Sequence, residues 1–261
     1  MIIDVHAHLN DEELYPRAEE IYGGMKDNNL LAVINAGYDI PSSNLAVELA
    51  EKYDKFFSVV GMHPHDSKSM TDEDYDVLAK LAVGKKNLAI GEIGLDYHYD
   101  LSPRETQKRV FVEQLRLAHS LKLPAVIHLR EAYGDMNELL RENARYTEYG
   151  ILLHCYGGSK ETAAELIKKY DAYFSFGGAV TFKNATEKPD IVRSIPIDRI
   201  LLETDCPYMT PVPYRGKPNE PKYINLVAEK MAEILDKSKE EIEEITVNNT
   251  KEFFKKINDS L

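Results

Sequence analysis

The segment IIDVHAH, residues 2–8, joins an apolar β-strand pattern to two histidines. Isoleucine and valine favour a pleated strand. Because residues two apart along a strand share a face, Asp4, His6 and His8 are predicted to point to the same side. The segment therefore predicts a buried strand whose carboxyl end brings imidazoles to one edge of a sheet.

Further short β-rich runs recur along the chain. Eight runs have this character: 2–6, 30–37, 56–63, 88–94, 124–130, 151–156, 172–178 and 199–205. Stretches with helical spacing lie between them, and 102–122 is an example. There Ser102 precedes Pro103 and Glu105 follows three residues later, which predicts a helix start at Ser102.

Alternation of strands and helices implies parallel strands joined by right-handed crossovers. Eight such units predict an α/β fold, a (β/α)8 TIM barrel, formed by residues 1–261 as one domain. Segment 239–257 is predicted to form two C-terminal helices packed on the outside of the barrel. A doubly wound open sheet is the alternative, but no glycine-rich phosphate loop follows the first run.

Composition limits the possible functions. The 261 residues are 43% hydrophobic and carry a net charge of -12, which argues against capture of DNA by a broadly basic surface. A nucleic-acid substrate would need a local cationic site. No stretch approaches about 20 apolar residues, and residues 1–10 lack the pattern of a signal peptide. We expect a cytoplasmic protein with no membrane association and no obligate protein partner.

Polar side chains gather where the predicted strands end, and five of the eight histidines are among them. The set is His6, His8, His63, Glu92, His128, His154 and Asp205. One histidine in an apolar run is more often a hydrogen-bonded core residue, and Glu92 alone can be a buried acid paired with an arginine. Burying all of them together is costly unless a cation satisfies them. Imidazole and carboxylate ligands suit zinc, manganese or nickel better than calcium, and one bridging carboxylate permits two ions.

The motifs DVHAHLN, GMHPHD, GEIGLDYH, VIHLRE, LLHCYGGS, GGAVTFKNA and LLETDCPYMTPVPYRGKPNEP occur in this order between residues 4 and 221. Together they resemble the TatD family of metal-dependent deoxyribonucleases, within the amidohydrolase-like superfamily. Where several relatives in that superfamily have a carboxylated lysine, this chain has Glu92, which favours the TatD branch. Asn10 departs from the aspartate of many members but lies outside the implied ligand set.

The resemblance implies two divalent ions per chain, of zinc, manganese, magnesium or nickel. It assigns His6, His8 and Asp205 to the first ion, Glu92 to a bridge, and His128 and His154 to the second ion. It also matches His63 and Glu203 to positions implicated in substrate handling or catalysis.

The chemistry follows from the residue types. Two ions would lower the pKa of a bridging water and yield hydroxide, for which Asp205 is the predicted general base. Glu203, two residues earlier on the same predicted face, is predicted either to receive the proton or to form a structural pair. Arg130 and Arg215 are the predicted phosphate contacts. Further candidates near the same loops are Lys183, Lys217 and the tyrosines Tyr97, Tyr156, Tyr208 and Tyr214.

We therefore predict an exonuclease that hydrolyses DNA at single strands or chain ends, because a pocket in a barrel mouth excludes the middle of a duplex. Hydrolysis of a small amide, lactone or ester by the same hydroxide is a second possibility. A third is a barrel that binds metal for stability or serves as a partner-binding module. Structural metal sites are usually closed by four ligands, which argues against the third.

Overall fold

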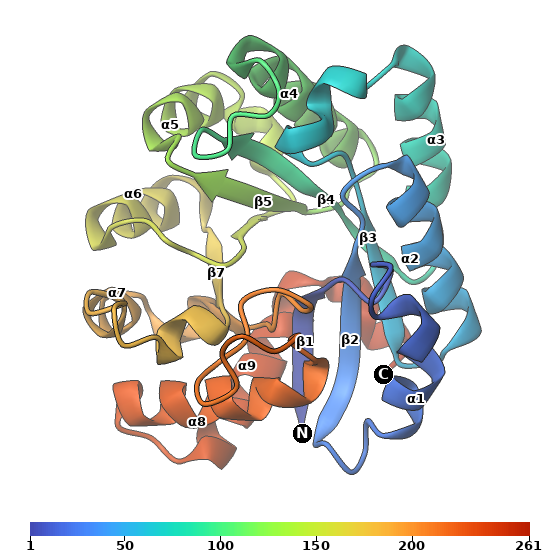
Figure 1. The fold of residues 1–261 in the computed structure, drawn as a ribbon. Coiled ribbons are helices and arrows are strands. Elements are labelled where there is room, and N and C mark those ends of the chain that lie inside the picture. Colours follow the sequence, from blue (N-terminus) through green and yellow to red (C-terminus); the bar gives the residue numbers. More distant parts are fainter.

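The computed structural model describes residues 1–261 and confirms the (β/α)8 barrel (Figure 1). All eight strands are parallel and follow one another around the sheet in chain order. Their bounds are β1 (Ile2–Ala7), β2 (Leu30–Ala36), β3 (Phe56–Val60), β4 (Asn87–Asp96), β5 (Ala125–Arg130), β6 (Ile151–Leu153), β7 (Tyr173–Phe176) and β8 (Ile200–Leu202). The ring is completed beyond β8, where the N–H of Asp205 donates to the carbonyl of His6 at 2.9 Å.

Helices surround the strands on the outside (Figure 1). The α-helices are α1 (Ala18–Gly23), α2 (Ile40–Lys52), α3 (Asp72–Ala82), α4 (Arg104–Ser120), α5 (Tyr133–Glu142), α6 (Lys160–Tyr170), α7 (Lys188–Ser194), α8 (Ile224–Leu235) and α9 (Lys239–Phe253). Short 3₁₀ helices are η1 (Tyr15–Arg17), η2 (Pro64–Ser69), η3 (Ala144–Thr147), η4 (Gly178–Thr181), η5 (Ile197–Arg199), η6 (Pro221–Tyr223) and η7 (Lys255–Asp259). None of the helices has the length and apolar character needed to cross a membrane.

The start of α4 differs from the prediction. The helix begins at Arg104, and the N–H groups of Thr106 and Gln107 donate to the carbonyl of Pro103. The Ser102 hydroxyl donates instead to the carbonyl of His65 at 2.6 Å. Ser102 therefore ties the loop after β3 to the start of α4, and it does not cap the helix.

The C-terminal segment forms two helical elements, as predicted, but its end lies under the barrel rather than on the outside. It forms one α-helix, α9, followed by the short η7. Phe253, Phe254 and Ile257 join the apolar cluster that fills the barrel and includes residues of all eight strands. The ring of Phe253 lies 5.0 Å from that of Tyr173, the first residue of β7. The end of the chain thus closes the amino-terminal end of the barrel.

Candidate metal centre

The carboxyl ends of the strands, opposite the apolar closure, bring the predicted histidines and acids together. Glu92 on β4 is at the centre and is almost fully buried. Its Oε2 lies 3.2 Å from Nε2 of His6 and 3.7 Å from Nε2 of His8. Its Oε1 lies 2.8 Å from both Nδ1 of His128 and Nε2 of His154. Each oxygen of one carboxylate therefore faces a different pair of histidines.

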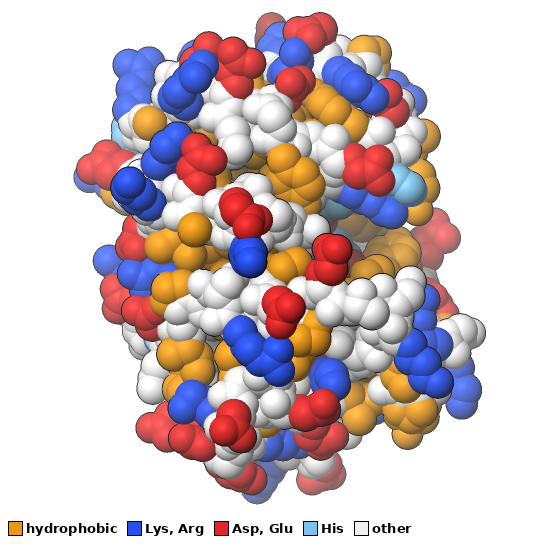
Figure 2. Space-filling view, turned by 90° about the vertical axis from the view of Figure 1, so that its left-hand side faces the viewer, with side chains coloured by type: hydrophobic (Ala, Val, Ile, Leu, Met, Phe, Trp, Pro, Cys, Tyr) orange, Lys and Arg blue, Asp and Glu red, His pale blue; other side chains and the backbone are white.

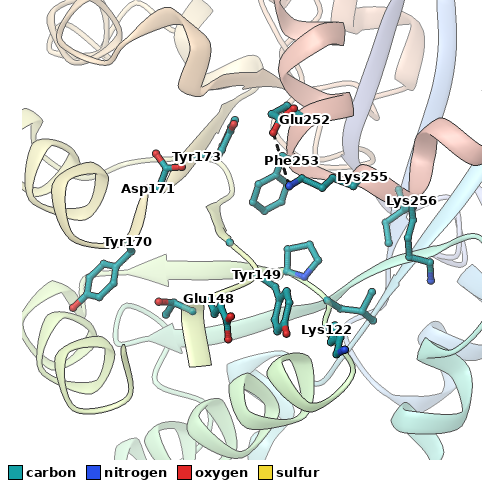
Figure 3. A pocket seen from close by; sticks show the side chains of 15 residues that line it. Lys122, Glu148, Tyr149, Tyr170, Asp171, Tyr173, Glu252, Phe253, Lys255 and Lys256 are labelled. Carbon is teal, nitrogen blue, oxygen red and sulfur yellow. Dashed lines mark ion pairs between the residues drawn. The ribbon is translucent and has the colours of Figure 1, made fainter. Parts of the chain in front are cut away.

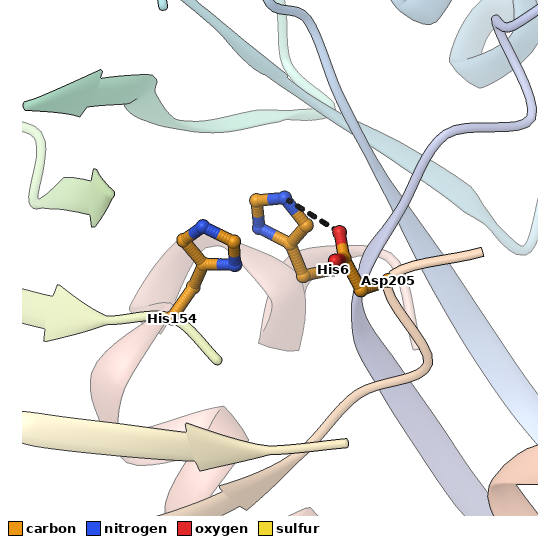
Figure 4. A group of neighbouring side chains, drawn as sticks. All are labelled: His6, His154 and Asp205. Carbon is orange, nitrogen blue, oxygen red and sulfur yellow. Dashed lines mark ion pairs between the residues drawn. The ribbon is translucent and has the colours of Figure 1, made fainter. Parts of the chain in front are cut away.

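Asp205 adds a second carboxylate on the side of the first pair. Its Oδ1 lies 3.4 Å from Nε2 of His8 and 3.9 Å from Nε2 of His6. The imidazoles of His6 and His154 stack with their centroids 4.0 Å apart, and Figure 4 shows both beside Asp205. Asp205 has a φ of 57°, a left-handed conformation that non-glycine residues rarely adopt and that recurs at functional sites. The backbone leaves the strand geometry here to aim this carboxylate at the histidines.

These donors fit divalent metal ions. Three groups each bring three ligand atoms within 4.8 Å of one another: His6, His154 and Asp205; His6, His8 and Glu92; and His63, Glu92 and His128. Imidazole nitrogens mixed with carboxylate oxygens suit transition-metal ions. Nδ1 of His154 and Oε1 of Glu203 are buried without any hydrogen-bond partner, which is unusual for polar atoms that the protein alone must satisfy.

Burial and neighbouring charges set the protonation of this cluster. Burial raises the pKa of Glu92, but its interactions with the imidazoles of His154, His63 and His6 outweigh burial and hold the pKa well below the usual range. Burial, together with the charge of His154, lowers the pKa of His6 to about 4. The ionised Glu92 and the neutral His6 are forms that bind a metal ion. Burial lowers the pKa of His154, but Glu92 outweighs burial and raises this pKa to about 10, so His154 must lose a proton to bind an ion.

His63 and Glu203 occupy different depths. Nε2 of His63 lies 3.4 Å from Oε1 of Glu92, on the wall of the cavity above the cluster. Glu203 is fully buried below His154, and its Oε2 accepts a 2.6 Å hydrogen bond from the Ser175 hydroxyl. Burial raises the pKa of Glu203 to about 7. His63 is thus placed to meet a ligand in the cavity, whereas Glu203 lies behind His154, with its Oε2 3.9 Å from Nδ1 of that residue.

Asp4 does not share a face with His6, contrary to the prediction. The pairing of β1 with β2 shifts register between Asp4 and Ala7, and Ile3 and Val5 on either side of Asp4 belong to the interior cluster. Both Asp4 oxygens bond Thr204 instead: Oδ1 accepts from its N–H at 2.9 Å and Oδ2 from its hydroxyl at 2.5 Å. The bulge interrupts the two-residue repeat and makes Asp4 a link between β1 and the end of β8.

A cavity of about 530 Å³ opens over the cluster. It is lined by His8, Tyr38, His63, His65, Asp66, Glu92, Tyr99, His128, Arg130, His154, Asp205, Tyr208 and Met209. Arg130 is the one lysine or arginine in this lining, and its guanidinium lies 4.8 Å from the Tyr99 ring. Arg130 and Tyr208, two of the predicted substrate contacts, therefore lie in the wall of this cavity.

The other candidates for substrate contact lie elsewhere. Arg215 is outside the lining, with its guanidinium 4.0 Å from the Phe182 ring, because the proline-rich loop folds back on η4. Lys183 and Lys217 also lie outside it. Tyr97 donates to Asp135, Tyr156 is buried in the core, and Tyr214 stacks on Tyr223.

Asp96 is a residue of this site that was missed in the sequence. Oδ2 of Asp96 lies 3.0 Å from Nε2 of His128 and 3.1 Å from Nε2 of His65. Burial raises the pKa of Asp96, but hydrogen bonds from His128 and the Tyr99 N–H outweigh it and hold the pKa well below its usual range. The two-residue repeat contained the signal, since Asp96 lies four residues after Glu92 in one strand.

Comparison with known proteins agrees with this geometry. The model of a family described as TatD related DNase matches residues 3–255. The chain belongs to the TatD family. The uncharacterized metal-dependent hydrolase YabD of Bacillus subtilis is 44% identical over 98% of this chain and 99% of its own length. The protein YcfH of Escherichia coli K12, also named an uncharacterized metal-dependent hydrolase, is 33% identical over 97% of this chain and 95% of its own length.

A solved structure shows the same TatD architecture. The crystal structure of YjjV, a TatD homologue from Escherichia coli K12, superposes with a TM-score of 0.90 over 97% of this chain and 98% of that chain, at 26% identity. The chain is therefore a metal-dependent hydrolase of the TatD family, with His, Glu and Asp clusters able to hold metal ions.

Proposed function

We propose that this hydrolase cleaves phosphodiester bonds of DNA and removes nucleotides from single strands or chain ends. The observation that carries the proposal is the position of the Glu92-centred cluster at the floor of a 530 Å³ cavity with Arg130 on its wall. A cavity of this size accepts a few nucleotide units at most, since ligand pockets of about 300–1,000 Å³ hold small molecules. The middle of a duplex does not reach such a floor.

The proposed ligand set divides between the two oxygens of Glu92. His6 and His8 face Oε2, with Asp205 beside His8, and His128 and His154 face Oε1. Bound divalent ions would supply an activated water molecule and neutralise the phosphate. Asp205 is the general base, because its carboxylate lines the cavity and can accept a proton there.

The walls supply the remaining interactions. Arg130 offers charged hydrogen bonds to a phosphate oxygen, and His63 faces the same space. Tyr99 and Tyr208 are half-exposed at the mouth, where their rings can stack on bases. On the face shown in Figure 2, acidic and basic side chains are interspersed, which agrees with local capture of DNA rather than broad attraction.

The decisive experiment compares DNA ends with other substrates. Metal-loaded protein is incubated with end-labelled linear single strands, with circular single strands, and with a panel of small amides, lactones and esters. We expect stepwise shortening of the linear strand only, abolished by chelator and by Glu92→Ala. Turnover of a lactone or amide with intact DNA would overturn the proposal in favour of a small-molecule hydrolase. Cleavage of circles would overturn the preference for ends.

A further inference from the structure

We propose that Asp96 is a positioning residue that holds His128 in the tautomer needed for metal binding and anchors the loop that carries Tyr99. The inference rests on the proposed role of His128 as a metal ligand. It is carried by the hydrogen bonds around one buried carboxylate at the end of β4.

The carboxylate of Asp96 is fully buried and held on both sides. Oδ1 accepts hydrogen bonds from the N–H groups of His98 at 3.0 Å and Tyr99 at 2.8 Å. Oδ2 faces the two imidazoles, His128 at 3.0 Å and His65 at 3.1 Å. The backbone is fixed as well, because the N–H of Asp96 donates to the Gln107 side chain at 2.9 Å. The carboxylate therefore has one orientation.

This orientation decides which nitrogen of His128 keeps its proton when an ion binds. An ionised carboxylate only accepts hydrogen bonds, so Nε2 of His128 must donate to Asp96. Nδ1 lies 2.8 Å from Glu92 and 3.2 Å from Nε2 of His154, so Nδ1 is the nitrogen that gives up its proton when an ion binds between these residues. A carboxylate behind a ligating histidine commonly fixes the tautomer and raises its basicity.

The same carboxylate supports the cavity wall. Its Oδ1 fixes the backbone of Tyr99, whose ring packs edge-on against His65 with centroids 5.3 Å apart. The guanidinium of Arg130 lies 4.8 Å from the same ring. Asp96 thus connects the floor of the cavity to the wall that we propose receives the phosphate.

The Asp96→Asn substitution keeps the shape of the side chain but removes its charge and replaces one acceptor oxygen by an NH₂ donor. If the asparagine oxygen keeps the bonds to the His98 and Tyr99 N–H groups, its NH₂ group faces Nε2 of His128, which must then accept. Nδ1 would carry the proton and could not bind a cation. If the amide turns over, its NH₂ group meets two N–H donors and both bonds are lost. Either arrangement weakens metal binding.

The test uses zinc-loaded full-length protein without DNA. Zinc affinity is measured by competition with a chromophoric chelator, and the histidine nitrogens are followed by ¹H–¹⁵N NMR. In the wild type we expect a protonated Nε2 on His128. In Asp96→Asn we expect zinc binding at one site to weaken about 10–100-fold, the usual effect of losing such a partner.

Tyr99→Leu is the matched control, because it alters the wall and leaves the Asp96–His128 bond intact. It should keep wild-type zinc affinity and raise KM for an oligonucleotide. Wild-type zinc affinity in Asp96→Asn, or an equal loss in Tyr99→Leu, would overturn the inference. If Asp96→Asn does not fold, the wild-type spectrum decides, since a protonated Nδ1 on His128 contradicts it. No readout except the KM uses DNA, so a failed nuclease assay leaves the test intact.

Discussion

The two ends of the barrel differ in what fills them: one end is filled by apolar side chains, and the other by polar side chains. At the amino-terminal end, Phe253, Phe254 and Ile257 complete the apolar interior. At the carboxyl end, the corresponding space holds imidazoles and carboxylates, among them Nδ1 of His154, which has no partner. Natural proteins keep such unsatisfied groups mainly where function needs them. We infer that the amino-terminal end stabilises the fold and that the carboxyl end carries the reaction.

A second hollow, at the amino-terminal end, sharpens the contrast. It measures about 260 Å³, and Figure 3 shows Tyr149, Phe253 and Lys255 among its lining. Two of its three lysines have partners within the protein: Lys255 lies 4.0 Å from Glu252, and Lys256 donates to the carbonyls of Gly84 and Asn87. A hollow alone therefore does not mark the active end of the barrel. The convergence of imidazoles and carboxylates on one cavity marks it.

The largest expected effect is from Glu92→Gln at the chemical end. The amide keeps the shape but removes the charge that both histidine pairs face, so bound metal should fall and activity should drop by at least about 10³-fold. Metal content by elemental analysis and turnover of an oligonucleotide measure the two effects. Circular dichroism should show an unchanged barrel. Activity within tenfold of wild type would contradict the central role of this carboxylate.

Phe254→Ala tests the opposite end. Its ring is fully buried, so truncation should lower the free energy of unfolding by about 3–5 kcal/mol. Urea denaturation measures that change, and kcat of the folded protein should stay near wild type. Val83→Ala, at a side chain that is 71% exposed, is the control and should shift stability by less than about 0.5 kcal/mol. A loss of kcat without a loss of stability would contradict the division between the ends.

Much of this division could be predicted from the sequence. All eight strands were expected, because parallel barrel strands are short, apolar and β-branched. The convergence of His6, Glu92 and His128 was also predictable, because strand ends in this fold meet at one mouth. The polar residues at the carboxyl ends of the predicted strands are therefore nearly the same set as the candidate metal ligands.

The misses have physical reasons. Asp4 was placed wrongly because a register shift in β1 breaks the two-residue repeat, and nothing in the local sequence marks the shift. Phe254 lies between α9 and η7, and its place under the barrel is set by packing against strands that are distant in the sequence. Arg215 lies on a loop, where spacing does not fix direction, and it packs on Phe182.

Arg130→Met gives the smallest of the expected effects and separates substrate capture from chemistry. The methionine keeps an unbranched apolar stem beside Tyr99 and removes the one arginine of the cavity lining. A charge-assisted hydrogen bond contributes about 1.5–3 kcal/mol, so kcat/KM for an oligonucleotide should fall about 10–100-fold. Most of the change should be in KM, because the metal-facing residues are untouched.

Arg215→Met is the matched control, since it removes the same charge from a loop outside the cavity. It should leave kcat/KM within about twofold of wild type, as expected for an exposed substitution away from the site. Metal content should be unchanged in both variants. If Arg215→Met is the more damaging of the two, substrate must cross the proline-rich loop before it reaches the cluster, and the binding surface extends beyond the mouth that Arg130 lines.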